Sequence, residues 1–323
     1  MTYIRSQVLH LNFESANLAK ALSSHKCSQI DLQKKGRAVL QLCDITVVSV
    51  TYNSDHVLSG MLASVPAEVP IVIVDNASTS GVPTVPGNRS ATVISKDTNH
   101  GFGRACNAGA AVATTPYLLF LNPDARLTPG CLERLMDAQQ DYPDASAFNP
   151  RVESPDGQVF FRRATRLRGN QGRIRVKPDH DMEVPVLSGA ALFVSKANFD
   201  AVCGFDEDIF LYVEDDDLSV RLQDAVGPLM LIFDAVVAHD AGTSTEPSLA
   251  IVAFKEFSLA RATVYAMRKH GRNLAFFQCL LHGLRKFTKP RTYRSAELKI
   301  AATSYLKGVW STRKDRGRYA PLG

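Results

Sequence analysis

Acidic residues at two places in the chain have the types and spacing that metal binding and proton transfer require. Asp124 follows the apolar run 117–121 after an Asn-Pro pair, and residues 214–217 are four consecutive acids. A carboxylate at a strand end can hold a divalent cation against a diphosphate. Crowded carboxylates raise one another's pKa values, which makes one of the four a candidate general base. A strand-ending turn and acids at a helix N-terminus are the structural alternatives for these two motifs.

A histidine and a glycine-rich stretch are weaker signals of a site. His239 follows the apolar run 229–234, so it comes after a strand end as Asp124 does, although a lone histidine is more often structural. The stretch GFGRAC at 101–106 lacks the third glycine of a dinucleotide-binding fingerprint and stands apart from the strand-like run 91–95. A helix that opens after Gly103 would still suit a phosphate.

Short apolar runs alternate with helical patterns between residues 44 and 250. Strands are expected at 45–50, 71–74, 91–95, 117–121, 145–149, 157–161, 185–195 and 229–234, and helices at 55–64, after Gly103, at 129–140 and after the four acids. This alternation predicts an α/β fold with a mostly parallel central sheet flanked by helices. Ligands of such a sheet gather outside the carboxyl ends of its strands, where Asp124 would lie.

Two stretches of this region have other properties. The Ser-Gly break at 188–189 interrupts a strand pattern, as happens where a backbone approaches a ligand closely. Residues 162–181 are basic, polar and poorly periodic, which predicts a mobile loop of the kind that covers active sites.

Composition indicates a globular protein without a disulfide framework. The chain has 323 residues, of which 45% are hydrophobic, enough to bury a substantial core. Its six cysteines show no C-x-x-C spacing, which argues against a zinc site and suits a reducing cytoplasm. No apolar run reaches the length of a transmembrane helix, and no signal peptide is recognised, so we expect a cytoplasmic protein.

The charge is divided unevenly along the chain. Residues 251–323 contain 16 Lys and Arg against 3 Asp and Glu, a charge of +13. Because the net charge of the whole chain is +5, residues 1–250 carry a charge of −8.

We expect an N-terminal extension of unassigned role at 1–43, a catalytic domain at 44–250 and a basic helical region at 251–323. The stretch 274–287 mixes large apolar side chains with cations, which predicts a helix on the inner, anionic membrane face. A helix packed on the protein is the alternative, and no nucleic-acid motif is present.

Seven blocks in one order resemble the inverting glycosyltransferases of family 2. The blocks are VVSVTYNS, IVIVDNAS, N-x-GFGRACNAG, LLFLNPDA, LSGAALFVSK, FDEDIFLYVEDDDLSVRL and AHDAG, between Asp44 and Gly242. The chain is most similar to bacterial rhamnosyltransferases of cell-surface polysaccharide synthesis. The resemblance implies a GT-A fold, a divalent metal such as Mg²⁺ or Mn²⁺, and a nucleotide-sugar donor, dTDP-rhamnose in this subgroup. It also implies a glycan or lipid-linked acceptor.

The resemblance assigns roles to individual residues. It implies that the nucleotide base and ribose are held by Thr51, Asn53, Asp75 and Asn76. The other residues that it implies in donor binding are Asn99, Gly101, Arg104, Asn107, Asn122 and Asp124. Asp215 matches the catalytic base, and Phe205, Asp206 and Glu214 match the border of the acceptor site. Asp217, two residues after Asp215 and equally acidic, is the reserve candidate for the base. Asp124 and His239 match the metal contacts. Direct displacement by one base inverts the anomeric centre without a carboxylate nucleophile.

The chain departs from the family pattern at two positions. Asn122 replaces the first acid of the D-x-D motif, which puts metal dependence in question, and Cys203 stands where a glycine commonly precedes Gly204. Two other functions compete with sugar transfer. A nucleotidyltransferase would show a glycine-rich, basic signature after the first strand, where this chain has Thr51-Tyr52-Asn53. A non-catalytic, membrane-associated protein that binds nucleotide-sugars would not need Asp124, Asp215 and His239 together.

Overall fold

The computed structural model describes residues 40–85, 89–169, 173–240 and 248–315. Contacts within the chain separate Met1–Gln41 from Leu42–Gly323, and the elements named below all belong to the second unit. The predicted N-terminal extension, 1–43, therefore lies outside the described residues except for its last four.

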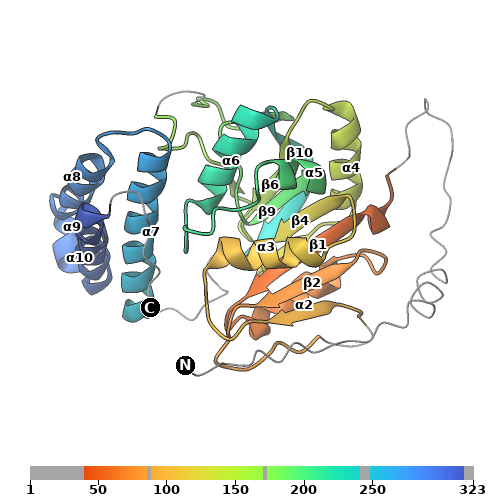
Figure 1. Cartoon of the computed structure of the whole chain (residues 1–323), viewed down its shortest axis with the longest axis horizontal. Helices are drawn as coiled ribbons and strands as arrows, with labels where there is room; N and C mark the ends of the chain where they lie inside the picture. The colour runs from red at the N-terminus through yellow and green to blue at the C-terminus, as the bar shows by residue number, and fades with distance from the viewer. Residues whose placement is uncertain (1–39, 86–88, 170–172, 241–247, 316–323) are drawn as a thin grey trace, which may run out of the picture. The chain divides into compact units, whose positions relative to one another are not determined.

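A ten-stranded mixed sheet forms the centre of the described fold (Figure 1). The strand order is β3-β2-β1-β4-β9-β6-β10-β5, with β7 paired to β6 and β8 paired to β10. The strands are β1 Ile45–Thr51, β2 Ile71–Asp75, β3 Thr92–Ser95, β4 Tyr117–Leu121, β5 Ala125–Leu127, β6 Ala147–Glu153, β7 Val159–Phe160, β8 Met182–Val184, β9 Ala191–Ser195 and β10 Leu229–His239.

The expected α/β fold, a central sheet flanked by helices, is confirmed. The structure also gives the directions of the strands, which make the sheet a mixed one. Strands β3, β2, β1 and β4 are parallel, as predicted, and so are β6 and β10. Strand β9 runs antiparallel between β4 and β6, and β5, β7 and β8 are also antiparallel to their partners. A buried apolar run carries no sign of its direction, so the sequence pattern could not show this. The run 185–195 is a strand only from Ala191.

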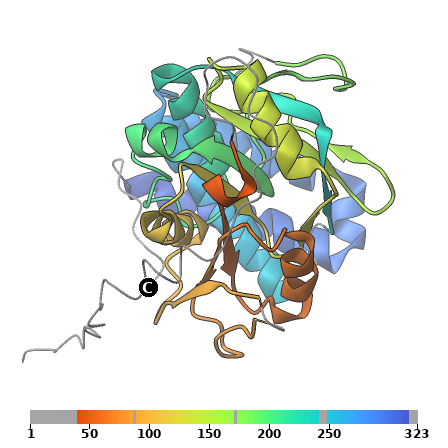
Figure 2. The ribbon, with the colours of Figure 1, turned by 90° about the vertical axis from the view of Figure 1, so that its right-hand side faces the viewer.

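Helices cover both faces of the sheet. They are α2 Asp55–Ser64, α3 Phe102–Val112, α4 Cys131–Asp141, α5 Lys196–Ala201 and α6 Glu214–Ala225. Figures 1 and 2 show α3, α5 and α6 on one face and α2 and α4 on the other. Helix α3 lies so close to β1 that a Cβ at Gly109 would overlap Val48. This close approach fixes α3 against the sheet beside the strand ends that matter for the site.

Four further helices follow the sheet: α7 Leu249–Lys269, α8 Ala275–Phe287, α9 Pro290–Arg294 and α10 Ala296–Ser311. Helix α10 packs along α7, where a Cβ at Gly308 would come within 2.5 Å of the Phe257 carbonyl oxygen. Val220 of α6 shares a hydrophobic cluster with α7, α8 and α10. The C-terminal helices are therefore packed on the helix that carries the four acids. Among the helices of the described ranges, none combines the length and apolar character that a bilayer crossing requires.

Candidate active site

Polar residues at the ends of β1 and β2 form one side of the site. Thr51 and Asp75 are register partners at the last positions of these parallel strands, and both are buried. The Asp75 carboxylate accepts hydrogen bonds from the Ser78 main-chain N–H and hydroxyl. Asn53 has a positive φ of 55° and accepts from the Thr79 N–H at 2.8 Å. The structure thus brings together three of the four residues predicted to hold the nucleotide in one braced turn region.

The fourth, Asn76, joins this region to the glycine-rich stretch. Its side-chain amide donates to Asn99 Oδ1 at 2.8 Å and to the Gly101 carbonyl at 3.2 Å. Gly101 has φ 99° and packs against the Phe210 backbone so closely that a side chain would overlap it. A cavity of about 420 Å³ opens beside Asn76, lined by Lys96, His100, Arg104, Ala105, Asn107, Ala108, Ala111 and Glu207. Lys96 and Arg104 bring two positive charges to this lining against the one negative charge of Glu207, which suits an anionic ligand.

Two residues predicted to bind the donor, Asn107 and Arg104, interact with the segment 205–207 of the protein. Asn107 donates to the Phe205 carbonyl and accepts from the Phe205 N–H, both at 2.9 Å. Arg104 forms an ion pair with Glu207 at 3.2 Å. Both residues line the cavity, but Asn107 has its amide oxygen and nitrogen occupied by the backbone of Phe205. Its role in this structure is to clamp the Phe205 segment onto α3.

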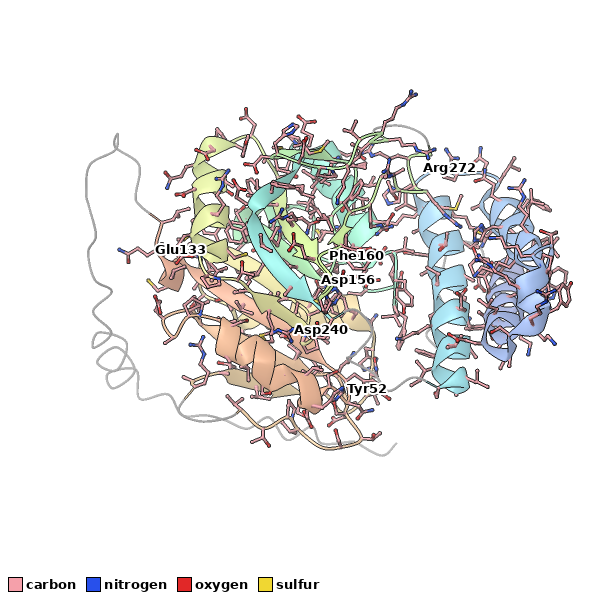
Figure 3. All side chains as sticks on the ribbon, turned by 180° about the vertical axis from the view of Figure 1, so that it is seen from behind. Tyr52, Glu133, Asp156, Phe160, Asp240 and Arg272 are labelled. Atoms are coloured by element: carbon pink, nitrogen blue, oxygen red, sulfur yellow. The ribbon has the colours of Figure 1, made fainter. Side chains whose placement is uncertain are left out.

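Asp124 and His239 meet beyond the end of β4, as the metal prediction requires. His239 is the last residue of β10, and its Nε2 lies 3.1 Å from Asp124 Oδ1. The backbone holds them there because β10 pairs with β5, with His239 opposite Ala125. Figure 3 shows the labelled side chains of Tyr52 and Asp240, which follow β1 and β10, on the side of the sheet nearer to α7.

Two protein ligands are fewer than a closed metal site would have. Within the described ranges, no group of three or more His, Cys, Asp or Glu side chains is placed to hold an ion. A carboxylate oxygen and an imidazole nitrogen nevertheless fit Mn²⁺ or Mg²⁺ when phosphate oxygens and water complete the coordination. The residues therefore fit a cation that binds together with a diphosphate.

Asp215 lies in the first turn of α6, with 17% of its side chain exposed. Its Oδ2 accepts from the Gly189 N–H at 3.2 Å and from Arg162 Nη1 at 3.1 Å. Its Oδ1 accepts from the Asp216 N–H at 2.9 Å. The Ser-Gly break predicted to approach a ligand thus approaches this carboxylate. These three donors orient a carboxyl group that solvent can reach, which is what a general base needs.

The other three acids of the run have different surroundings. Glu214 is 8% exposed, and burial followed by the charge of Asp215 raises its pKa to about 8. Burial and then Asp215 also raise the pKa of Asp216, to about 6, although it pairs with Arg162 and Thr165. Burial alone would raise the pKa of Asp217, but a hydrogen bond from His270 and the charges of Arg221 and Lys269 lower it to about 2.

Asp217 is a structural anion, which weakens its standing as the reserve candidate for the base. Its side chain has no exposed surface, and His270 Nε2, Lys269 Nζ and Arg221 Nε each lie 2.8 Å from its oxygens. Lys269 and His270 stand at the end of α7. Asp217 therefore ties the helix of the predicted base to the C-terminal helices.

We expect Asp217→Ala to lower the free energy of unfolding by about 3–5 kcal/mol, because it removes a fully buried anion on which Arg221, Lys269 and His270 converge. Urea unfolding measures this loss. Because folding lowers the pKa from 3.8 to about 2, the stabilising contribution is fully present above pH 3.8 and is lost as the pH falls through about 2. Asp224→Ala, on the exposed end of α6, is the matched control and should change stability by less than about 0.5 kcal/mol. Equal stability of Asp217→Ala and wild type would contradict this role.

Two residues predicted to border the acceptor contact other parts of the protein instead of facing an open site. Phe205 is 2% exposed and packs against Phe120 and Phe199. Asp206 accepts from Lys269 Nζ at 2.6 Å and from the Tyr265 hydroxyl at 3.0 Å. In this structure Phe205 therefore belongs to the core, and Asp206 joins its loop to α7.

Arg162, Lys269 and His270 are site residues that the sequence did not reveal. Arg162 lies in the segment predicted as a mobile loop, yet Thr165 and Leu167 of that segment are buried and 170–172 lie outside the described residues. Lys269 and His270 belong to the basic tail, where nothing distinguishes them from the other cations. Only the folded chain shows that all three contact the acids of α6.

Comparison with known proteins gives a consistent set of likenesses. The sequence profile described as Glycosyl transferase family 2 matches residues 46–200. An N-acetylglucosaminyl-diphospho-decaprenol L-rhamnosyltransferase of Mycobacterium tuberculosis is 30% identical over 238 residues, covering 62% of this chain and 77% of the relative. The low-salt glycan biosynthesis hexosyltransferase Agl10 of Haloferax volcanii is 23% identical over 195 residues, covering 56% of this chain and 62% of the relative.

A solved structure supports the fold. The mannosyltransferase PcManGT from Pyrobaculum calidifontis, in complex with GDP-Man and Mn²⁺, has a TM-score of 0.52 to this chain at 18% identity. The likeness covers 81% of this chain and 73% of that protein. At this identity it shows a shared arrangement of sheet and helices.

Proposed function

The chain belongs to glycosyl transferase family 2 and has the GT-A fold, and we propose that it is an inverting rhamnosyltransferase. Asp215 carries the mechanistic part of this proposal, because it is the acid of α6 that is both oriented by three donors and open to solvent. Asp215 takes the proton of an acceptor hydroxyl, whose oxygen then bonds to the anomeric carbon. The bond from that carbon to the diphosphate breaks, and its electron pair leaves with the nucleoside diphosphate.

The donor and the acceptor are proposed from the relative in M. tuberculosis. The name of that enzyme gives L-rhamnose as the sugar and an N-acetylglucosaminyl-diphospho-lipid as the acceptor. We infer dTDP-rhamnose as the donor and a glycan or lipid-linked hydroxyl as the acceptor for this chain. The braced turns at Asn53, Asp75 and Asn76 and the cationic cavity beside them support a nucleotide site on this side of the sheet.

Asp124 and His239 would hold the divalent cation. Bound there, Mg²⁺ or Mn²⁺ would neutralise the charge that develops on the leaving diphosphate. The presence of Mn²⁺ in the related mannosyltransferase structure is in line with this proposal. We further propose that the enzyme works at the inner membrane face, since a lipid-linked acceptor would be held there.

Release of nucleoside diphosphate from a panel of nucleotide-sugars tests this function. With Mn²⁺ and an N-acetylglucosaminyl-diphospho-lipid acceptor, we expect release from dTDP-rhamnose at least tenfold faster than from UDP- or GDP-sugars. Omission of the acceptor is the control for donor hydrolysis. Pyrophosphate release from a nucleoside triphosphate and a sugar phosphate would instead indicate a nucleotidyltransferase. Donor binding without any release would indicate the non-catalytic alternative.

A further inference from the structure

Helix α8 and the residue before it turn four large apolar side chains away from the protein. The outward side chains are 49–65% exposed and follow one another at intervals of three, four and three residues: Leu274, Phe277, Leu281 and Leu284. Such spacing places them in one stripe of the helix. A helix on a water-soluble domain normally directs this stripe at the core and its polar side at solvent. In α8 this stripe faces solvent instead.

The fully buried residues of α8 are small. Ala275, Cys279 and Gly283 are buried at intervals of four residues. A Cβ at Gly283 would overlap Leu306 of α10, so α8 and α10 are in close contact along this side. Phe276 and Leu280 also pack against the hydrophobic cluster that α8 shares with α7 and α10, whereas Leu274, Phe277, Leu281 and Leu284 stay exposed and remain available to a partner.

One flank of the apolar stripe continues into a groove between α8 and α10. The groove has a volume of about 590 Å³, and its lining is Leu280, Phe287, Thr303, Leu306, Lys307, Trp310, Ser311 and Arg313. Trp310 is 55% exposed at this groove. Indole rings and cations next to an apolar surface are typical of segments that lie at a membrane interface.

The other flank carries cations that face one another. Arg166 Nη2 lies 3.3 Å from the His282 ring, and burial followed by the charges of Arg166, Lys286, Lys289 and Arg285 lowers the pKa of His282 to about 4. Lys286 pairs with Glu256. No carboxylate in the described part of the chain forms an ion pair with Arg166, Arg285 or Lys289. These three charges are therefore available to anions from outside.

We propose that Leu274, Phe277, Leu281 and Leu284, together with Arg285 and Lys289, form a docking face for an anionic lipid bilayer. Charge complementarity selects this partner, because residues 274–315 contain nine Lys and Arg against two acids. A bilayer also accepts both parts of the face at once, since acyl chains cover the apolar stripe while headgroups meet the cations.

The docking face is connected to the predicted base by a short segment. Arg162 pairs with Asp215 and Asp216, and Arg166, four residues later, contacts His282 of α8. Arg272 lies against Gly169 at the end of the same segment, near the top of α7 in Figure 3. A lipid-linked acceptor held in the bilayer would thus be presented on the Arg162 side of Asp215. This last step rests on the proposed function, whereas bilayer binding itself does not.

Co-sedimentation of the full chain with vesicles, without any sugar nucleotide, tests the docking face. We expect pelleting with phosphatidylglycerol-containing vesicles and not with pure phosphatidylcholine, and release as salt rises from 0.1 to 0.5 M. Arg285→Gln with Lys289→Gln should weaken partitioning about 20- to 30-fold, about fivefold for each cation. Phe277→Ser with Leu281→Ser should weaken it at least tenfold.

Matched variants separate the face from general effects. Arg285→Lys with Lys289→Arg keeps both charges and should bind as wild type does. Val112→Ser, on α3, removes an apolar side chain that is 47% exposed and should also bind normally. Equal binding to neutral and anionic vesicles, no binding, or normal binding by both weakening variants would overturn the proposal. A dimer that Phe277→Ser dissociates would show instead that the face joins two copies.

Activity measurements separate this inference from the proposed function. With an acceptor embedded in anionic vesicles, the weakening variants should raise KM and leave kcat for a water-soluble acceptor unchanged. Loss of activity with both acceptors would contradict a docking role. If no sugar is transferred to any acceptor, the vesicle result still stands alone and the proposed function fails.

Discussion

Asp215→Asn is expected to lower the turnover of sugar transfer by about 10²- to 10⁴-fold while the donor still binds. The amide keeps the shape of the carboxylate, and its oxygen can still accept from the Gly189 N–H or Arg162. It cannot take the proton of the acceptor hydroxyl. Steady-state kinetics and calorimetric titration of the donor, made on the same preparation, separate turnover from donor binding.

Asp224→Asn is the matched control for this change. Asp224 lies near the end of the same helix, where it pairs with Arg168 and its side chain is 61% exposed. The turnover of the Asp224→Asn variant should therefore stay within about twofold of wild type. NMR of the product should show the anomeric configuration inverted relative to the donor. A near-normal rate for Asp215→Asn would move the base to Glu214 or Asp216, and retained configuration would contradict direct displacement.

The strand ends of the site could be predicted because their signals are local. Apolar runs that stop at Asp75 and at Asn122-Pro123-Asp124 indicate buried strands and their carboxyl ends without any knowledge of partners. Parallel strands then bring these ends to one edge of the sheet. The meeting of Asp124 with His239, 115 residues later and 3.1 Å apart, has another cause, because β10 runs on to His239 and pairs antiparallel with β5, a short strand that the sequence pattern did not indicate.

The different environments of the four acids could not be predicted, because they depend on contacts from distant segments. In the sequence Asp215, Asp216 and Asp217 are equivalent. In the structure Asp217 pairs with Lys269 and His270 at the end of α7, whereas Asp215 and Asp216 pair with Arg162. No periodic pattern in the sequence indicates either contact, because one depends on how α7 packs on α6 and the other on how the segment after β7 packs on α6.

The departure at Cys203 also has a structural reading. Cys203 has φ 61°, the left-handed conformation that glycine adopts without strain, and Gly204 follows with φ 65°. A cysteine therefore adopts a left-handed conformation here, at some conformational cost, at the position where the resemblance implies a glycine. The fold tolerates this substitution because the Cys203 side chain is exposed.

Asp124→Ala is expected to abolish the increase in donor affinity that Mn²⁺ or Mg²⁺ produces. Asp124 is 3% exposed and supplies the carboxylate beside His239, and the alanine leaves a single protein ligand at this place. An imidazole alone holds these oxygen-preferring cations poorly. Calorimetric titration of dTDP-rhamnose with and without metal should show at least a tenfold metal effect for wild type and none for Asp124→Ala.

Two further variants make this test specific to the metal. Asp234→Ala removes an exposed acid from the same strand as His239 and should keep the full metal effect. Asn122→Asp restores the missing first acid of a D-x-D motif and so adds a carboxylate beside Asp124. This variant should lower the metal concentration that gives half of the effect. Should Asp124→Ala respond to metal as wild type does, the cation is held elsewhere, and the assignment of Asp124 and His239 as its ligands fails.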